Sequence, residues 1–139
     1  MSIDISNINF NIEDIERLKE VYLNFDNNQI QNIYHQGFNE ITNINLFTNL
    51  KKLDLEFNRN IKDCHINNLY SLEKLSLPSN KLLTNKGIIN LNELKYIDLS
   101  FNKNINNEAI KNKKNLEYLK LIHNKKINDE AFTNIKKLM

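Results

Sequence analysis

Aliphatic side chains recur along the second half of the chain with a period of 22 residues. Four consecutive blocks, residues 50–71, 72–93, 94–115 and 116–137, align without gaps, and each opens with the pattern Leu-x-x-Leu/Ile-x-Leu-x-x-Asn. Because alternate side chains of a strand point to the same face, the alternating aliphatic residues predict a short strand at the start of each block. A second group of aliphatic positions follows, and each block is predicted to be a strand, a turn and a short helix.

Asparagine fills one column of the aligned blocks completely, directly after the predicted strand. A buried asparagine needs hydrogen-bond partners, and a stacked column of asparagines can bond the backbone of adjacent turns. We therefore predict a structural asparagine ladder. Its members are Asn58, Asn80, Asn102 and Asn124.

Two further columns are expected to mark the two ends of each helix. Aspartate and asparagine are good N-cap residues, because their side chains accept from the free backbone N–H groups of the first turn. The expected N-caps are Asp63, Asn85, Asn107 and Asp129. Asparagine also tolerates the left-handed conformation that ends many helices. The residues expected in that role are Asn68, Asn90, Asn112 and Asn134.

On the four in-phase copies of LxxLxLxxN, the sequence resembles that of leucine-rich-repeat proteins. The tails of the blocks, LTNKGI, INNEAI and INDEAF, resemble those of the cysteine-containing subclass found in F-box-associated intracellular proteins. The resemblance implies an α/β fold, a right-handed solenoid with a parallel sheet on its concave face and short helices on its convex face. It also implies a non-enzymatic module that binds a protein partner.

The length of 139 residues indicates a single domain that spans residues 1–139. We expect residues 1–17 to form an N-terminal cap, residues 18–49 to hold degenerate repeats, and residues 138–139 to begin a truncated repeat. Because solenoids need a polar terminal cap, the last strand is expected to leave an open apolar edge. We expect that this uncapped C-terminal end permits self-association.

The scarce residue types exclude several classes of protein. Gly37 and Gly87 are the only glycines, so neither a dinucleotide-binding nor a phosphate-binding glycine loop can form. The single Cys64 excludes a disulfide framework and a paired-cysteine metal site, and we expect no cofactor and no metal. With no membrane-spanning run, no secretory signal and no glycosylation motif, the chain is expected to be intracellular, cytoplasmic or nuclear, rather than secreted.

The outward positions of the predicted strands supply the candidate partner-binding site. Exposed aromatic side chains beside acids and lysines are typical of protein-binding surfaces. The alternative is that the phenylalanines only shield the strand ends. The candidate residues are Lys52, Asp54, Glu56, Phe57, Lys74, Tyr96, Asp98, Phe101, Tyr118, Lys120, Ile122 and His123.

Two other interpretations of binding depend on particular features. A basic column could bind nucleic acid or an anionic lipid, although the net charge of only +2 counts against a nucleic-acid partner. Its members are Arg59, Lys81, Lys103 and Lys125. The resemblance to F-box-associated repeats implies substrate recognition within a ubiquitin-ligase assembly, although no F-box segment is found.

An enzyme is the third alternative. Cys64 and His123 could form a nucleophilic pair, but the repeat frame places them on opposite sides of the solenoid. Asp54, Glu56 and Asp98 on neighbouring turns could act as paired carboxylates or bind Ca²⁺. Because the sequence shows neither a pocket nor a dense ligand cluster around them, we predict no enzymatic activity and no metal site.

Overall fold

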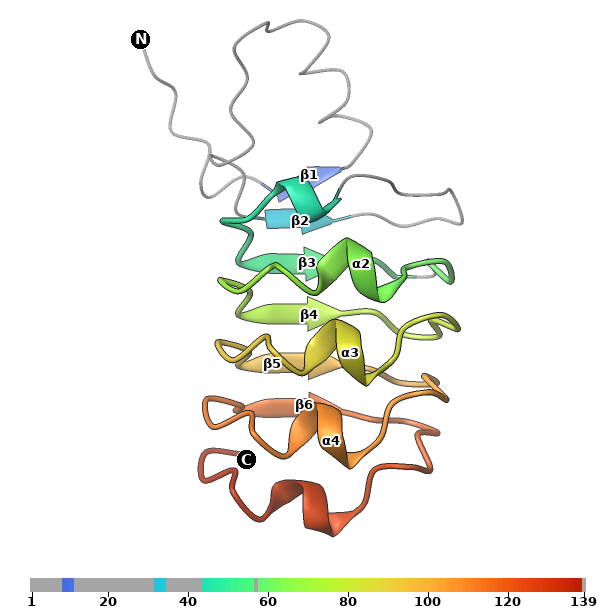
Figure 1. Ribbon diagram of the computed structural model, residues 1–139, viewed down its shortest axis with the longest axis vertical. Helices are drawn as coiled ribbons and strands as arrows, with labels where there is room; N and C mark the ends of the chain where they lie inside the picture. The colour runs from blue at the N-terminus through green and yellow to red at the C-terminus, as the bar shows by residue number, and fades with distance from the viewer. Residues whose placement is uncertain (1–8, 12–31, 35–43, 57, 139) are drawn as a thin grey trace, which may run out of the picture.

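The computed structural model describes residues 9–11, 32–34, 44–56 and 58–138, and within them six parallel strands form one sheet. The strands lie side by side in chain order, so each turn of the chain adds the next strand (Figure 1). The strands are β1 (Asn9–Asn11), β2 (Asn32–Tyr34), β3 (Lys52–Asp54), β4 (Lys74–Ser76), β5 (Tyr96–Asp98) and β6 (Tyr118–Lys120). The helices are η2 (Ile44–Leu46), α2 (Asp63–Ile66), α3 (Asn85–Ile88), α4 (Asn107–Ile110) and η3 (Asp129–Phe132).

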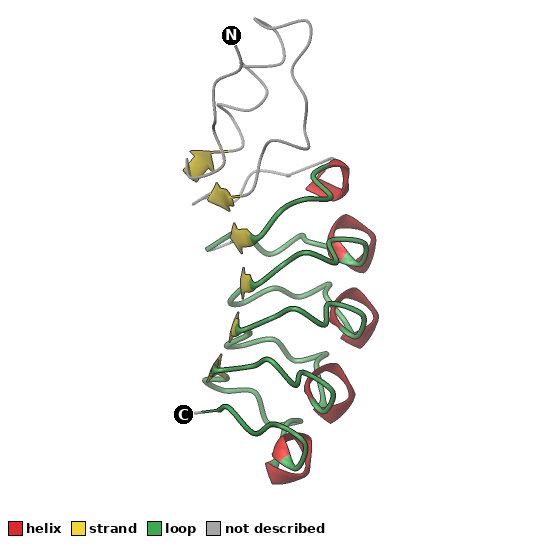
Figure 2. Cartoon of the chain, turned by 90° about the vertical axis from the view of Figure 1, so that its left-hand side faces the viewer, coloured by secondary structure: helices red, strands yellow, loops and turns green. Residues whose placement is uncertain are grey.

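The strands and the helices form the two sides of a shallow arc. Figure 2 shows the strands along the inner, concave side and the helices along the outer, convex side. The register is exact across the repeats, since Leu53 pairs with Leu75, Leu75 with Ile97, and Ile97 with Leu119. The predicted α/β leucine-rich-repeat solenoid is therefore confirmed, with the predicted phase of 22 residues.

The core is a continuous aliphatic column between the sheet and the helices. Within residues 50–115 the leucines of the repeat motif are completely buried, among them Leu53, Leu75 and Leu99. Burying one such side chain contributes about 1.5–3 kcal/mol. A single turn has no core of its own, because the inward face of each strand is covered by its own helix and by both neighbouring turns.

The asparagine ladder lies where the sequence predicts it, directly after the strands. Asn80 donates from Nδ2 to the Asn58 carbonyl oxygen (3.3 Å), and Asn102 donates to the Leu77 carbonyl oxygen (2.7 Å). Within one turn, Asn80 Oδ1 accepts from the backbone N–H groups of Leu82 (3.0 Å) and Leu83 (2.9 Å). These bonds join adjacent turns and also satisfy the backbone where it leaves the sheet.

The predicted N-caps are wrong by one residue. The cap is the preceding residue, and Thr84, Asn106 and Asn128 each accept from a backbone N–H of the first helical turn. In these three repeats spacing alone could not separate the two positions, because both carry side chains that accept hydrogen bonds.

The residues predicted as caps instead bond the cap of the next turn, and we call this row the outer ladder. Asp63 accepts from the backbone N–H (2.8 Å) and hydroxyl (2.6 Å) of Thr84. Asn107 accepts from the backbone N–H of Asn128 (3.0 Å) and donates to its Oδ1 (2.7 Å). Asn85 and Asn106 make the same pair of bonds. The helices are thus joined by side chains as regularly as the strands are joined by backbone bonds.

The pairing of Asn107 with Asn128 in the outer ladder can be tested by substitution. Asn107→Asp is expected to lower the free energy of unfolding by about 1 kcal/mol, because a carboxylate cannot donate to Asn128 Oδ1. Adding Asn128→Thr, which copies the Asp63–Thr84 pair, is expected to restore most of that loss. Urea unfolding of the two single variants and the double variant measures the coupling. Strictly additive effects would contradict the proposed pairing.

The predicted left-handed residues after the helices are also wrong. Among the described residues other than glycine, only Ser79, Phe101 and His123 have positive φ, at 62°, 63° and 57°. They occupy one column immediately before the ladder asparagine, so the sharp reversal follows the strand and not the helix. Asn68, predicted to end a helix in this conformation, instead donates from Nδ2 to the Asn45 carbonyl oxygen (3.0 Å).

The N-terminal predictions fall largely outside the described residues. β1 lies within residues 1–17, the predicted cap, and β2 lies within residues 18–49, the predicted degenerate repeats. The two strands pair directly, so the sheet continues through both segments.

The C-terminal turn is less buried than the turns before it. Leu119, Leu121 and Ile127 are only partly buried, whereas their equivalents one turn earlier are completely buried. Asn124 Nδ2 is buried and has no hydrogen-bond partner within the described part of the chain. An apolar edge is present here, and self-association through it stays a prediction.

Candidate functional site

Two columns of side chains project from the strands toward the concave side. They flank the buried central residue of each strand, because alternate strand residues point to opposite faces. The register places Lys74, Tyr96 and Tyr118 in one column. The second column contains Asp54, Ser76, Asp98 and Lys120.

The first column is an aromatic stack with a cation above it. The rings of Tyr96 and Tyr118 are parallel, with centroids 4.6 Å apart and an interplanar angle of 4°. Lys74 Nζ lies 4.9 Å from the centroid of the Tyr96 ring. Burial raises the pKa of the Tyr96 hydroxyl, so this phenol remains a neutral hydrogen-bonding group at physiological pH.

The second column is held by ion pairs between neighbouring strands. Asp54 lies 3.7 Å from Lys74 Nζ, and Asp98 lies 3.3 Å from Lys120 Nζ. The hydrogen bond to Asp98 raises the pKa of Lys120. The Asp98 side chain is only 8% exposed, and its Oδ1 accepts from the Ser100 backbone N–H (3.0 Å). Asp98 therefore supports the turn after β5 as well as contributing charge to the concave face.

The middle of the concave face is hollowed into a central depression of about 320 Å³. It forms because the two middle repeats carry small residues there, with Ser76 and Ser100 buried at its base. The equivalents of these serines in the flanking repeats are larger or charged. The depression is lined by Asp54, Glu56, Ser76, Pro78, Asp98, Ser100, Phe101, Lys120 and Ile122.

Three large apolar side chains stand at the C-terminal side of this face, and we call them the apolar rim. Phe101, Tyr118 and Ile122 are 46%, 47% and 48% exposed. Phe101 packs against His123 with ring centroids 4.9 Å apart. Its positive φ is an unfavourable conformation for a bulky residue, so the fold holds this ring in place at some energetic cost.

The structure brings most of the predicted site residues together on one face. Tyr96, Tyr118 and Lys74 are in contact, and Phe101 and Ile122 border the same depression. Lys52 starts β3 and is exposed in the register position before Lys74. Phe57 lies outside the described residues.

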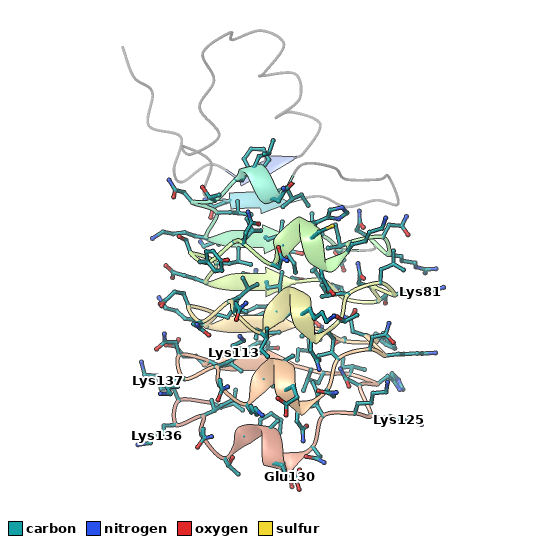
Figure 3. All side chains as sticks on the ribbon, viewed as in Figure 1. Lys81, Lys113, Lys125, Glu130, Lys136 and Lys137 are labelled. Carbon is teal, nitrogen blue, oxygen red and sulfur yellow. The ribbon has the colours of Figure 1, made fainter. Side chains whose placement is uncertain are left out.

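The basic column follows the edge of the solenoid beyond the C-terminal ends of the strands. Figure 3 shows Lys81 and Lys125 extending outward along that edge. A basic groove of about 500 Å³ lies there, lined by Arg59, Ser79, Asn80, Lys81, Phe101, Lys103 and Asn104. Phe101 thus lines both the groove and the central depression.

The catalytic candidates are not brought together. Cys64 lies in α2 on the convex side, whereas His123 packs against Phe101 beyond β6. The central depression contains Asp54 and Asp98 but is not lined by His123. Within the described residues, no group of three or more His, Cys, Asp or Glu side chains is arranged to hold a metal ion.

Among the described residues, no helix is both long and apolar enough to cross a bilayer.

The sequence analysis missed Lys113, a buried cation. Its side chain is about 1% exposed, and Nζ donates to the carbonyl oxygens of Ile88 (2.8 Å) and Ile89 (2.9 Å). Burial lowers its pKa from 10.5 to about 8. The signal was present in the repeat frame, where Lys113 occupies the column of the apolar Leu69 and Leu91.

Comparison with known proteins agrees with the architecture. No protein-family model and no curated protein matches the sequence. Among solved structures, the chain is similar to an internalin from Listeria monocytogenes, with a TM-score of 0.61 and 22% sequence identity. The match covers 79% of this chain and 32% of the internalin chain, so this chain corresponds to about a third of that length. At this identity the similarity concerns the fold, which is that of a leucine-rich-repeat protein.

Proposed function

We propose that the protein is a non-enzymatic interaction module that binds one protein partner on the concave face of its sheet. The observation that carries this proposal is the apolar rim, whose three members are about half exposed. Phe101 and Ile122 line the central depression, and Tyr118 lies at the start of β6 on the same face. Aromatic and aliphatic side chains in such positions supply most of the binding energy of protein interfaces. The solenoid resembles solved leucine-rich-repeat structures, and the extended concave surfaces of solenoids serve this purpose.

The polar residues around the rim contribute orientation and specificity. The ion pairs Asp54–Lys74 and Asp98–Lys120 lie on the same face and offer alternating charge to a partner. Charges at the border of an interface chiefly set the association rate and the choice of partner. Because the strands fix these side chains before binding, little conformational entropy is lost when the partner docks.

The proposal also concerns the cellular location of the protein and a more specific role. The cytoplasm or nucleus is the proposed location, on the grounds of the single Cys64 and the absence of a glycosylation motif. Substrate recognition in a ubiquitin-ligase assembly rests only on the resemblance of the repeat tails, and no contact among the described residues favours it over another protein partner.

Site-specific photo-cross-linking in cells of the source tests the proposal. A photo-reactive phenylalanine at position 118, on the rim, is expected to capture one protein. The matched control is position 70, because Tyr70 is 60% exposed but lies between α2 and β4, outside the sheet face. Capture of the same proteins at both positions, or of none at position 118, would contradict the proposal.

A further inference from the structure

The basic groove next to the concave face is lined by three exposed cationic side chains. Arg59, Lys81 and Lys103 occupy one column on successive turns, and adjacent strands lie about 5 Å apart. All three side chains are exposed. Within the described residues, neither Lys81 nor Lys103 belongs to an ion pair, whereas Lys74, Lys95 and other lysines do.

The backbone at the base of the groove is already hydrogen-bonded. The Lys81 backbone N–H donates to the Arg59 carbonyl oxygen (3.3 Å), and Asn104 Nδ2 donates to the Lys81 carbonyl oxygen (2.9 Å). The donors that remain for a ligand are therefore the lysine ammonium groups. Ammonium groups at this spacing match a row of carboxylates or phosphates.

The charges and the aromatic residue around the groove favour carboxylates over phosphates as its ligands. Phe101 is shared with the central depression, where Asp54, Glu56 and Asp98 contribute negative charge. A nucleic acid carries a negative charge at every nucleotide, so a strand that extended from the groove onto the concave face would meet these acids. Single-stranded binding also uses several aromatic platforms, and among the described residues that line this groove Phe101 alone is aromatic. A polypeptide can confine its acids to the groove and present other residues to the concave face.

We propose that the basic groove binds an acidic segment of the protein partner, with its carboxylates on Lys81 and Lys103 and an apolar side chain on Phe101. The inference rests on the proposed function and specifies the chemistry of the partner. In an extended segment, alternate side chains point the same way and are about 7 Å apart. Flexible lysine side chains on backbones about 5 Å apart can reach this wider spacing, so the favoured segment carries Asp or Glu at every second position.

Fluorescence polarisation with the whole chain tests the inference. The probe is a short labelled peptide in which aspartate alternates with serine, and the competitor is an oligothymidylate of equal length. We expect saturable peptide binding that weakens as salt is raised and that the oligothymidylate displaces poorly. Lys81→Glu with Lys103→Glu is expected to weaken peptide binding by roughly tenfold or more.

The matched control is Lys86→Glu with Lys114→Glu, which changes the net charge equally and replaces two exposed lysines outside the groove. This pair is expected to retain peptide binding. Equal loss in both double variants, tighter binding of the oligothymidylate, or no peptide binding would overturn the inference. The proposed function is judged separately, because cross-linking at position 118 does not depend on the groove lysines.

Discussion

Asn80→Ala is expected to lower the free energy of unfolding by about 3 to 5 kcal/mol, because each buried polar group left unsatisfied costs about 1–3 kcal/mol. The Asn80 side chain is 1% exposed. It accepts from the N–H groups of Leu82 (3.0 Å) and Leu83 (2.9 Å) and donates to the Asn58 carbonyl oxygen (3.3 Å). Alanine makes none of these bonds. It also leaves a cavity, and a water molecule that filled the cavity would disturb the packing around it.

A loss of this size would be a large part of the stability of an ordinary domain, which is about 5–15 kcal/mol. Urea unfolding followed by circular dichroism measures it. Asn90→Ala is the control, since Asn90 is an exposed asparagine in the same repeat and is expected to change stability by less than about 0.5 kcal/mol. Equal effects of the two substitutions would show that asparagine at position 80 is not structural.

Lys113→Leu is expected to raise the free energy of unfolding by about 2 kcal/mol at pH 7, a gain where most core substitutions cause a loss. Burial lowers the pKa of Lys113 from 10.5 to about 8, which corresponds to an unfavourable contribution of about 3 kcal/mol. Leucine fits the column, because Leu69 and Leu91 are completely buried there. Part of the gain is offset at Ile89, whose carbonyl oxygen loses the bond from Nζ.

The lowered pKa of Lys113 also determines how the effect of the substitution changes with pH. Between about pH 8 and 10.5 the unfolded chain keeps a proton on Lys113 that the folded chain has released, so the stability of the natural chain rises with pH in this window. Below pH 8 both states are protonated and the full penalty is present. The stability difference between Lys113→Leu and the natural chain is therefore expected to be largest at pH 7 and to shrink toward pH 10.

Unfolding curves at several pH values, with Lys114→Leu as an exposed control, measure this difference. A variant that is less stable than the natural chain at pH 7, or a difference that does not change with pH, would contradict the penalty assigned to Lys113.

The repeated features of the fold could be predicted from the sequence because the same residue type recurs at the same position of successive turns. Leu53, Leu75 and Ile97 are buried at the predicted positions. Asn80 and Asn102 bond the preceding turn as expected. A column of identical residues restricts the structure, because whatever environment suits one member must be present in every turn.

The errors arise where several positions offer similar chemistry. Thr84 and Asn85, or Asn106 and Asn107, are adjacent and both can accept hydrogen bonds. The sequence alone does not say which of the two side chains caps the helix and which bonds the cap of the next turn. The left-handed conformation was assigned to Asn68 by residue preference, yet it falls on Phe101 because the turn geometry of the repeat overrides that preference.

The candidate site could be predicted only in part, because it depends on differences between repeats. The concave columns follow from strand alternation, which places Tyr96 and Tyr118 together. The central depression forms where Ser76 and Ser100 are smaller than their equivalents, a contrast that the aligned blocks contain but that a single block does not show. Lys113 was missed for the same reason, since it departs from its column instead of conforming to it.

The apolar rim on the concave face is the surface that we propose binds the partner. The most direct test is isothermal titration of the captured partner into the chain that carries Phe101→Asn, Tyr118→Ser and Ile122→Ser. These side chains are about half exposed, and asparagine suits the positive φ at position 101, so the melting temperature is expected to change little. The affinity for the partner is expected to be at least about a hundredfold weaker, by about 3 kcal/mol. Unchanged affinity in a folded triple variant would contradict it.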